Sequence, residues 1–309
     1  MDVNAKRVDS PTYKIMMYLN KYEPELLDNE KIQFLFKNLQ TNFKKLFYTI
    51  AHINKVQKDE DFIKEYNQTS VVSISSVEYC YYKISTIWDI AYQIADKLIF
   101  PNKKSGDKYE YLEKKFEGYA DNFDALQLGW YRDLNKVRNK IVHGGITVNP
   151  FYVNDDEVKN RICFQAYDFN LDDLIQPHYM YSNECNNNIN FADNYFAFHT
   201  HLLYSYLCDF FEFILIELNK DKNHDREKLS LDELPYELFE RGQKTWLLSE
   251  VDTFTEITKE MIALQLADGH LNNINKVSIQ DIEQFYDYFP FTMMKRISDG
   301  DFVLAANES

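Results

Sequence analysis

The stretch Ser73–Phe100, SISSVEYCYYKISTIWDIAYQIADKLIF, decides the fold class of this chain. Its apolar residues recur at alternating steps of three and four positions, so an α-helix places them on one face. They are Ile74, Val77, Tyr81, Ile84, Trp88, Ala91, Ala95 and Leu98. A proline follows at position 101 and cannot continue a helix. The stretch therefore predicts one long helix with a continuous buried side.

Two further stretches predict long helices that would pack against the first. From about Asn29 to about Gln57, apolar residues again recur at three- and four-residue steps. They are Phe34, Leu35, Leu39, Phe43, Leu46, Phe47 and Ile50. The second runs from about Asp193 to Leu218, and its most apolar part, Leu202 to Leu218, contains Asp209, Glu212 and Glu217. These acids favour a buried helix over a membrane span.

A shorter helix is predicted from about Phe123 to Val142. Trp130, Leu134, Val137 and Ile141 form its apolar stripe, and Gly144 and Gly145 provide the stop. Near the N-terminus, Ser10 followed by Pro11 predicts another helix start. The polar segment 57–70 is either a weaker element or a connection, and residues 101–108 read as a loop.

The pattern changes after the two glycines. The segments GITVNPFYV (145–153) and RICFQAYDF (161–169) are short and rich in β-branched and aromatic residues. They predict a two-stranded hairpin at about 146–170. The Asn-rich segment NECNNNINF (183–191) predicts a loop.

The expected fold class is therefore mainly α, a helical bundle with a small β-hairpin insertion and additional C-terminal helices. The charged run NKDKNHDREK (219–228) marks the best boundary. It separates a bundle (31–220) from a C-terminal helical subdomain (221–309) of unknown role, and residues 1–30 are expected to form an N-terminal helical extension. In the last part, Ser230 with Glu233 and Thr253 with Glu256 fit the capping box that begins a helix. Ser278 precedes a further short helix that stops at Pro290.

Composition limits the function classes. The chain has 309 residues, 45% of them hydrophobic, and a net charge of −15. This balance argues against disorder and against a broad electrostatic footprint for nucleic acid. Locally the balance reverses, because the segment from Tyr131 to Gly145 holds four Lys or Arg and one acid. The aromatic cluster YCYYK (79–83) offers faces for stacking on bases, although such clusters more often fill cores.

Cysteines and the N-terminal segment indicate a cytoplasmic protein. Cys80, Cys163, Cys185 and Cys208 are widely separated and have no zinc-like spacing, so reduced thiols are expected. The first residues contain no apolar core of a signal peptide. No metal or other cofactor is expected, and no membrane association. His199 and His201 would chelate a metal only from a strand, since on a helix they lie about 200° apart.

The stretch RDLNKVRNKIVHGG (132–145) carries the chemistry. Within it, Arg138-Asn139-Lys140-Ile141-Val142-His143 resembles the R-x4-6-H signature of the HEPN superfamily, the higher eukaryote and prokaryote nucleotide-binding domains. The resemblance covers about Lys31 to Leu218. It implies a helical bundle and, as in many members, a metal-independent ribonuclease of toxin–antitoxin, abortive-infection or CRISPR-associated systems. It also implies a homodimer in which two motifs meet.

Carried onto this chain, the resemblance makes Arg138 and His143 the catalytic pair and Asn139 their helper. Histidine suits proton transfer near neutral pH, and the arginine fork suits a phosphate. Arg132 and Lys140 are candidate RNA-binding residues. Asp89, central on the first helix, is the candidate for an acid that orients the pair.

Helical geometry adds a constraint on this site. Asn139 and His143 share one face, opposite the apolar stripe, while Arg138 lies roughly 140° around the helix from His143. A second copy of the chain would also supply the second proton-transfer group that RNA cleavage needs.

Other functions remain open for the same residues. Cations near a helix C-terminus stabilise its dipole by about 0.3–1 kcal/mol each, which alone would account for Arg138, Lys140 and His143. The chain would then be an inactive HEPN-like module that binds a nucleotide or a partner protein, or a helical interaction protein with a coincidental motif. If it is a toxin or phage-defence effector, an antitoxin or another defence protein is the expected partner.

Overall fold

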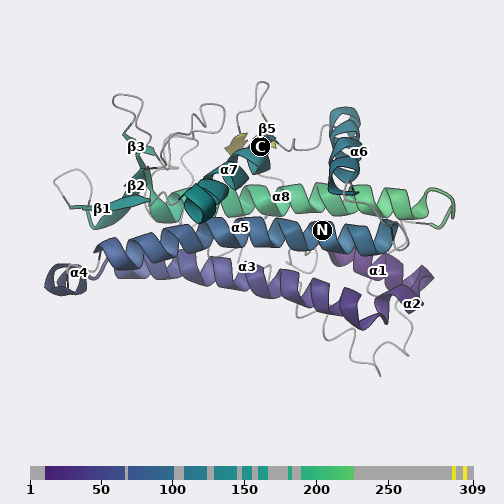
Figure 1. Ribbon diagram of the computed structural model, residues 1–309, viewed down its shortest axis with the longest axis horizontal. Coiled ribbons are helices and arrows are strands. Elements are labelled where there is room, and N and C mark those ends of the chain that lie inside the picture. The colour runs from purple at the N-terminus through teal and green to yellow at the C-terminus, as the bar shows by residue number, and fades with distance from the viewer. Residues whose placement is uncertain are drawn as a thin grey trace, which may run out of the picture. The chain divides into compact units, whose positions relative to one another are not determined.

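The computed structural model describes residues 11–66, 69–100, 108–123, 129–144, 148–154, 159–165, 180–182, 189–225, 294–296 and 302–304. Figure 1 shows that helices make up most of this part of the chain. The helices are α1 (Tyr13–Tyr22), α2 (Pro24–Leu27), α3 (Glu30–Val56), α4 (Glu60–Tyr66), α5 (Thr69–Ile99), α6 (Lys108–Phe123), α7 (Gly129–Gly144) and α8 (Ala192–Asn219). The prediction of a mainly α protein with a small β insertion is confirmed.

The three long predicted helices are present as α3, α5 and α8, each within a few residues of the predicted bounds. Their apolar faces are buried, as the side chains of Leu39, Trp88 and Leu207 illustrate with exposed fractions of 0%. The segment predicted to be buried rather than membrane-spanning lies within α8. In the part of the chain that the structure describes, no helix is both long and apolar enough to cross a membrane.

Two helical expectations were wrong in part, and one helix was not expected. The first helix begins at Tyr13, with Thr12 as its N-cap, two residues after the predicted start at Pro11. The predicted helix from Phe123 is observed as α7, which begins at Gly129. A separate helix, α6, ends at Phe123 and had not been predicted. Its buried residues Leu112, Phe116 and Ala120 follow a four-residue step, but many polar neighbours mask this stripe in the sequence.

The β insertion is larger than predicted. Strands β1 (Asn149–Val153) and β2 (Arg161–Gln165) form the predicted hairpin. They belong to an antiparallel sheet of order β1-β2-β4-β3, with β3 at Met180–Ser182 and β4 at Ile189–Phe191. The last three residues of the Asn-rich segment therefore form a strand, because pairing with β2 satisfies their backbone groups. Strands β5 (Met294–Arg296) and β6 (Phe302–Leu304) form a separate pair. The predicted capping boxes and the helix after Ser278 lie outside the described residues.

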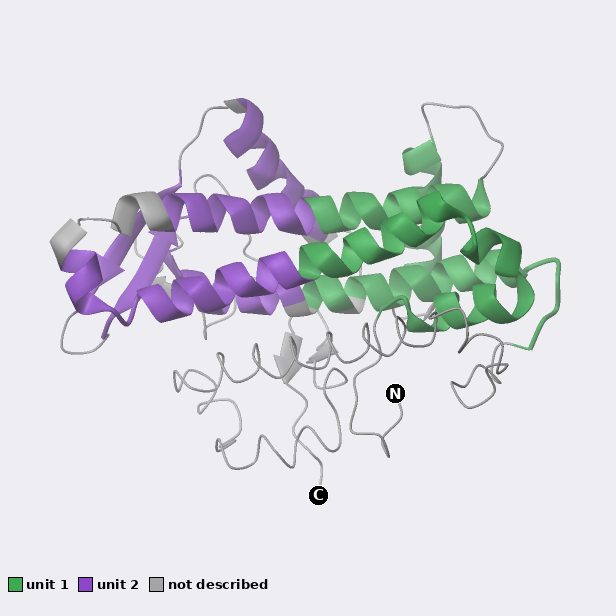
Figure 2. Cartoon of the chain, turned by 90° about the horizontal axis from the view of Figure 1, so that it is seen from below, with its two compact units in different colours: residues 1–43, 86–128, 202–256 green, residues 44–85, 129–201, 257–309 purple. Residues whose placement is uncertain are grey.

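Contacts divide the chain into two compact units, coloured in Figure 2. Unit 1 comprises residues 1–43, 86–128 and 202–256, and unit 2 comprises residues 44–85, 129–201 and 257–309. Each unit contains a segment of α3, of α5 and of α8. The division near residues 30 and 220 that the sequence suggests stays a prediction.

Unit 1 is held together by aromatic packing. Its centre is Trp88, whose ring lies 5.5 Å from Tyr92, 5.9 Å from Tyr206 and 5.4 Å from Phe210. Phe116 of α6 meets the Phe210 ring edge-on at 5.3 Å. Edge-on and tilted ring pairs of this kind stabilise a core beyond the area they bury, which explains how polar α6 stays attached.

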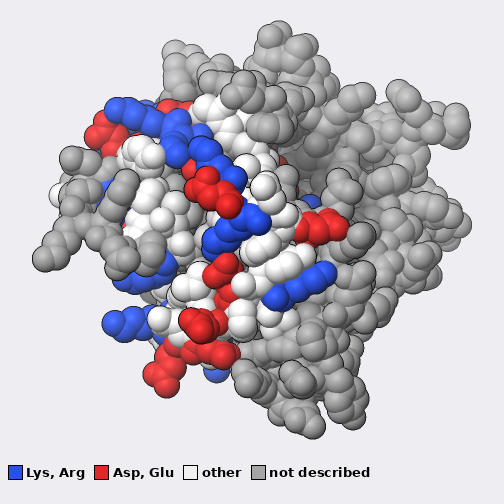
Figure 3. Space-filling model, turned by 90° about the vertical axis from the view of Figure 1, so that its right-hand side faces the viewer, with Lys and Arg blue, Asp and Glu red and all other residues white. Residues whose placement is uncertain are grey.

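The surface of unit 1 carries paired charges. Figure 3, which faces the right-hand side of Figure 1, shows basic and acidic side chains interspersed. Several form ion pairs between elements, including Lys14 with Glu212 at 3.3 Å and Lys115 with Glu217 at 2.8 Å. Where a cation lies next to an acid in this way, the two charges largely cancel and leave little net potential.

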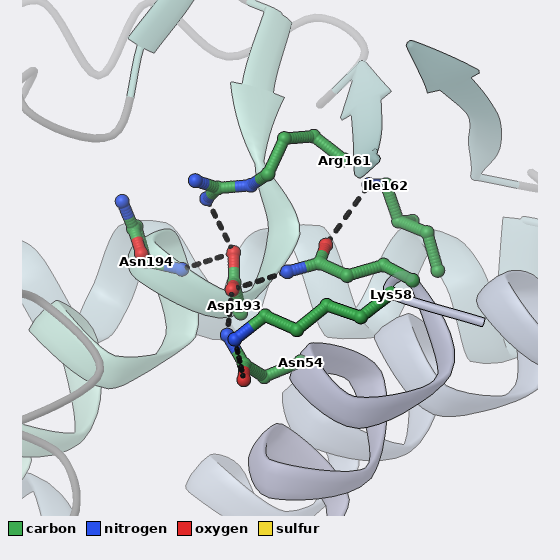
Figure 4. A network of polar contacts seen from close by, with 7 residues as sticks. Asn54, Lys58, Arg161, Ile162, Asp193 and Asn194 are labelled. Carbon is green, nitrogen blue, oxygen red and sulfur yellow. Dashed lines mark hydrogen bonds and ion pairs between the residues drawn. The ribbon is translucent and has the colours of Figure 1, made fainter. Parts of the chain in front are cut away.

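Unit 2 contains a buried polar network at the start of α8 (Figure 4). Arg161 of β2 donates to Asp193 Oδ1 at 2.7 Å, and both side chains are almost fully buried. Asn54 and Gln57 of α3 donate to Asp193 Oδ2 at 2.8 and 2.7 Å. The amide oxygen of Gln57 in turn accepts from the backbone N–H of Ile162 at 3.0 Å. The network therefore fixes α3, β2 and α8 to one another within unit 2.

Candidate active site

Helix α7 presents two distinct faces. Tyr131, Leu134, Val137 and Ile141 are buried, with exposed fractions of 2–8%. The opposite face follows steps of four, three and four residues and consists of Arg132, Lys136, Asn139 and His143. Arg132, Lys136 and His143 are exposed, and Asn139 is half-buried. The outward placement of Asn139 and His143 agrees with the helical geometry predicted from the sequence.

Arg138 lies between these faces and reaches toward the outer one. Its Nη1 donates to Asn139 Oδ1 at 2.8 Å. The bond draws the guanidinium around the helix toward the face that also carries His143, one turn beyond Asn139. The guanidinium therefore points closer to the His143 side of α7 than the backbone position of Arg138 alone would place it. Among the described residues, no direct hydrogen bond joins these two side chains.

Partial burial limits the freedom of the Arg138 side chain. Its Nε is buried and has no hydrogen-bond partner among the described residues. A buried donor that lacks a partner typically costs about 1–3 kcal/mol. The guanidinium thus keeps donor capacity that neither Asn139 nor the rest of α7 satisfies.

Helix α5 lies next to this part of α7. Burial chiefly, and then the charge of Glu78, raise the pKa of Tyr82, while the positive charge of Arg138 acts in the opposite direction. Tyr82 therefore lies close enough to Arg138 for their charges to interact. One turn further along α5, Ser85 Oγ donates to Asn135 Oδ1 of α7 at 3.4 Å. Sequence reasoning did not single out Tyr82, and only its place in the aromatic cluster 79–83 pointed to it.

His143 occupies the last turn of α7 and is exposed. Its neighbour Val142 is also unusually open for an apolar residue, with 44% of its surface exposed. Arg132 lies on the same outer face as His143, whereas Lys140 is half-buried on the flank. Lys136, not considered from the sequence, forms an ion pair with Asp133 at 2.7 Å.

The remaining sequence candidates lie elsewhere. Asp89 is exposed on α5 and belongs to unit 1, whereas Arg138 and His143 belong to unit 2, so its orienting role stays a prediction. His199 and His201 lie on α8, and His199 is fully buried against the ring of Tyr195. Among the described residues, no group of three or more His, Cys, Asp and Glu has a geometry that would hold a metal ion.

Known proteins were compared with the chain in three ways, by family, by sequence and by structure. No protein-family model, no curated protein and no solved structure matches it.

Proposed function

We propose that this protein is a HEPN-like, metal-independent endoribonuclease that acts in the cytoplasm as a toxin or phage-defence effector. The observation that supports it is the hydrogen bond from Arg138 to Asn139, which turns a cationic fork toward the face of α7 that carries an exposed histidine. This combination offers a phosphate-binding group and a proton-transfer group within the last two turns of one helix.

The chemistry assigns a role to each side chain. The 2′-oxygen attacks the adjacent phosphorus and loses its proton to the imidazole of His143. The bond between phosphorus and the 5′-oxygen then breaks, and the leaving oxygen takes up a proton from an imidazolium. The guanidinium of Arg138 stabilises the charge that develops on the phosphorane, and Asn139 fixes its orientation. The products are a 2′,3′-cyclic phosphate and a 5′-hydroxyl.

Two copies of the chain complete the site. One histidine serves as base and a second as acid, and α7 supplies a single histidine. Two exposed side chains at the end of α7, Val142 and His143, suit an interface in which the same surface meets itself across a twofold axis. Arg132 and Lys140 would then line the approach of the RNA from both protomers.

The alternative is an inactive HEPN-like module that binds a nucleotide or a partner protein. The partial burial of Arg138 near Tyr82 favours this alternative. An arginine held in place by its surroundings can bind a phosphate group without taking part in its cleavage. A module that binds a nucleotide shares phosphate binding with the ribonuclease, but only the ribonuclease predicts RNA cleavage.

Expression in a bacterial host tests the proposal. We expect wild type to arrest growth and fragment cellular RNA, whereas Arg138→Ala and His143→Ala lose at least a hundredfold in cleavage, as expected for loss of phosphate stabilisation or acid–base catalysis. The matched control is Lys136→Ala, which removes a cation from the same face of α7 that Asp133 already neutralises. Intact RNA under strong expression of wild type would contradict the proposal. Equal cleavage by all three variants would show that the site lies elsewhere.

A further inference from the structure

The outer face of α3 in unit 2 carries a row of basic and aromatic side chains. Lys45, Tyr48, His52 and Lys55 follow one another at steps of three, four and three residues, so they share a face. All four are exposed, and Tyr48 exposes 63% of its surface although it is a large ring. The row therefore places an exposed aromatic face next to cations, the combination that single-stranded nucleic acids bind.

No acid of α3 neutralises this face. From Lys31 to Val56 the helix contains five lysines and no Asp or Glu, in a chain whose net charge is −15. On α6, by contrast, Lys114 is paired with Glu110 at 2.7 Å. The charged side chains that α3 itself contributes to this face are therefore all positive, although the protein as a whole is acidic.

Helix α5 extends the row. Lys83 places its ammonium 5.0 Å from the centre of the Tyr79 ring, within range of a cation–π interaction. Burial lowers the pKa of Lys83, and the charge of Lys45 lowers it further. Lys45 and Lys83 thus lie near one another although they come from different helices. We call these six residues, Lys45, Tyr48, His52, Lys55, Tyr79 and Lys83, the basic track.

The basic track leads toward the candidate active site. Tyr82 directly precedes Lys83 on α5, and its environment includes the charge of Arg138 on α7. On α5, Lys83 therefore lies near a cation of α3, and the neighbouring Tyr82 lies near a cation of α7. All of these residues belong to unit 2.

We propose that the basic track binds single-stranded RNA, with Lys45 and Lys83 on consecutive phosphates and Tyr48 and Tyr79 stacked on bases, so that the strand runs on to Arg138. Charge complementarity identifies the ligand class, since phosphates repeat at the spacing of single residues along a strand. Aromatic rings between the cations favour unpaired bases over a duplex, whose bases are stacked on one another. The inference rests on the proposed ribonuclease function and adds to it the surface that delivers the substrate.

Binding and cleavage are measured separately to test this. Fluorescence anisotropy of the full chain uses a fluorescein-labelled single-stranded RNA whose 2′-hydroxyls are methylated, so that it binds without being cut. Each ionic contact with a single strand contributes about 0.7 to the slope of log K against log salt, so Lys45→Ala/Lys83→Ala should bind about 25-fold more weakly at 0.1 M salt. Tyr48→Ala should lose about fivefold or more, with Tyr48→Phe restoring binding. The control Lys114→Ala should bind as wild type does, because Glu110 already neutralises that charge.

The outcomes distinguish the two proposals. If wild type binds the methylated RNA and the double variant does not, the basic track is the RNA surface, even if no cleavage is seen. If wild type cleaves RNA and the double variant binds and cleaves equally well, the basic track is not the RNA surface, although the ribonuclease stands. Displacement of the RNA by poly-glutamate at equal charge concentration would also overturn the inference, since it would identify a surface for acidic protein segments.

Discussion

Replacement of Asp193 by asparagine tests the network that organises unit 2. In the wild type, Oδ1 accepts from Arg161 and from the backbone N–H of Asn194, and Oδ2 accepts from Asn54 and Gln57. Asparagine keeps one acceptor oxygen and places an NH2 group where the other stood. Two donors then face a donor, and the guanidinium of Arg161 loses its countercharge inside the protein.

The expected loss of stability is large. Breaking a buried ion pair by removing one partner costs about 3–5 kcal/mol, compared with about 5–15 kcal/mol for the whole stability of a typical domain. Removing the exposed partner Lys64, which pairs with Glu60 on α4, should leave the stability almost unchanged, because water screens an exposed ion pair. The double variant Arg161→Met/Asp193→Leu should be more stable than Asp193→Asn, because no unpaired charge remains buried.

Urea unfolding followed by circular dichroism at the helical minimum measures these differences. If Asp193→Asn is as stable as Lys64→Ala, the buried network does not stabilise unit 2 more than an exposed ion pair does, and the prediction is wrong. It is also refuted if the double variant is the least stable of the three, because removal of both charges should relieve the penalty.

Three further predictions follow from α7 and α5. Asn139→Ala should reduce RNA cleavage at least about tenfold, the effect of losing one hydrogen bond to a charged group, while the unfolding midpoint stays within error of wild type; unchanged cleavage would mean that Asn139 does not orient Arg138. Val142→Glu should convert a dimer to a monomer in sedimentation equilibrium and abolish cleavage, because it places like charges across a twofold interface; a dimer that persists would place the interface away from α7. Burial raises the pKa of the Cys80 thiol well above its usual range, so iodoacetamide should modify Cys80 only in denaturant. Mass spectrometry measures the labelling, with Cys80→Ser as the control. Rapid labelling of Cys80 in the native protein would contradict its buried position.

The long helices were predictable because each has a continuous apolar face. The alternating steps through Val77, Ile84 and Trp88 predict α5. Apolar packing has no directional requirement, so the pattern alone is enough to predict a buried face. Helix α6 was missed because its three buried residues stand among charged ones. Strand β4 was missed because three residues in an Asn-rich segment carry too little pattern to outweigh their turn-forming neighbours.

The candidate site was predictable as far as helix periodicity extends. Counting residues around α7 places Asn139 and His143 outward, and the structure agrees. The bond from Arg138 to Asn139 depends on side-chain torsions that no periodicity specifies. Gln57 carried a signal that was overlooked, since it continues the buried row of Ile50 and Ile53 and a polar residue on such a row needs a partner. The sequence also shows that α3 contains lysines and no acid from Lys31 to Val56. That Lys45 of α3 lies near Lys83 of α5 could be learned only from the fold.

The end groups of the cleaved RNA show whether the chain is a metal-independent ribonuclease that uses His143. Purified protein is incubated with a defined single-stranded RNA in excess EDTA, and the fragments are analysed by mass spectrometry beside those from His143→Ala. We expect wild type to form fragments that end in a 2′,3′-cyclic phosphate and begin with a 5′-hydroxyl, and we expect His143→Ala to form none. Fragments with a 3′-hydroxyl, cleavage that stops when EDTA is added, or the same fragments from His143→Ala would contradict it.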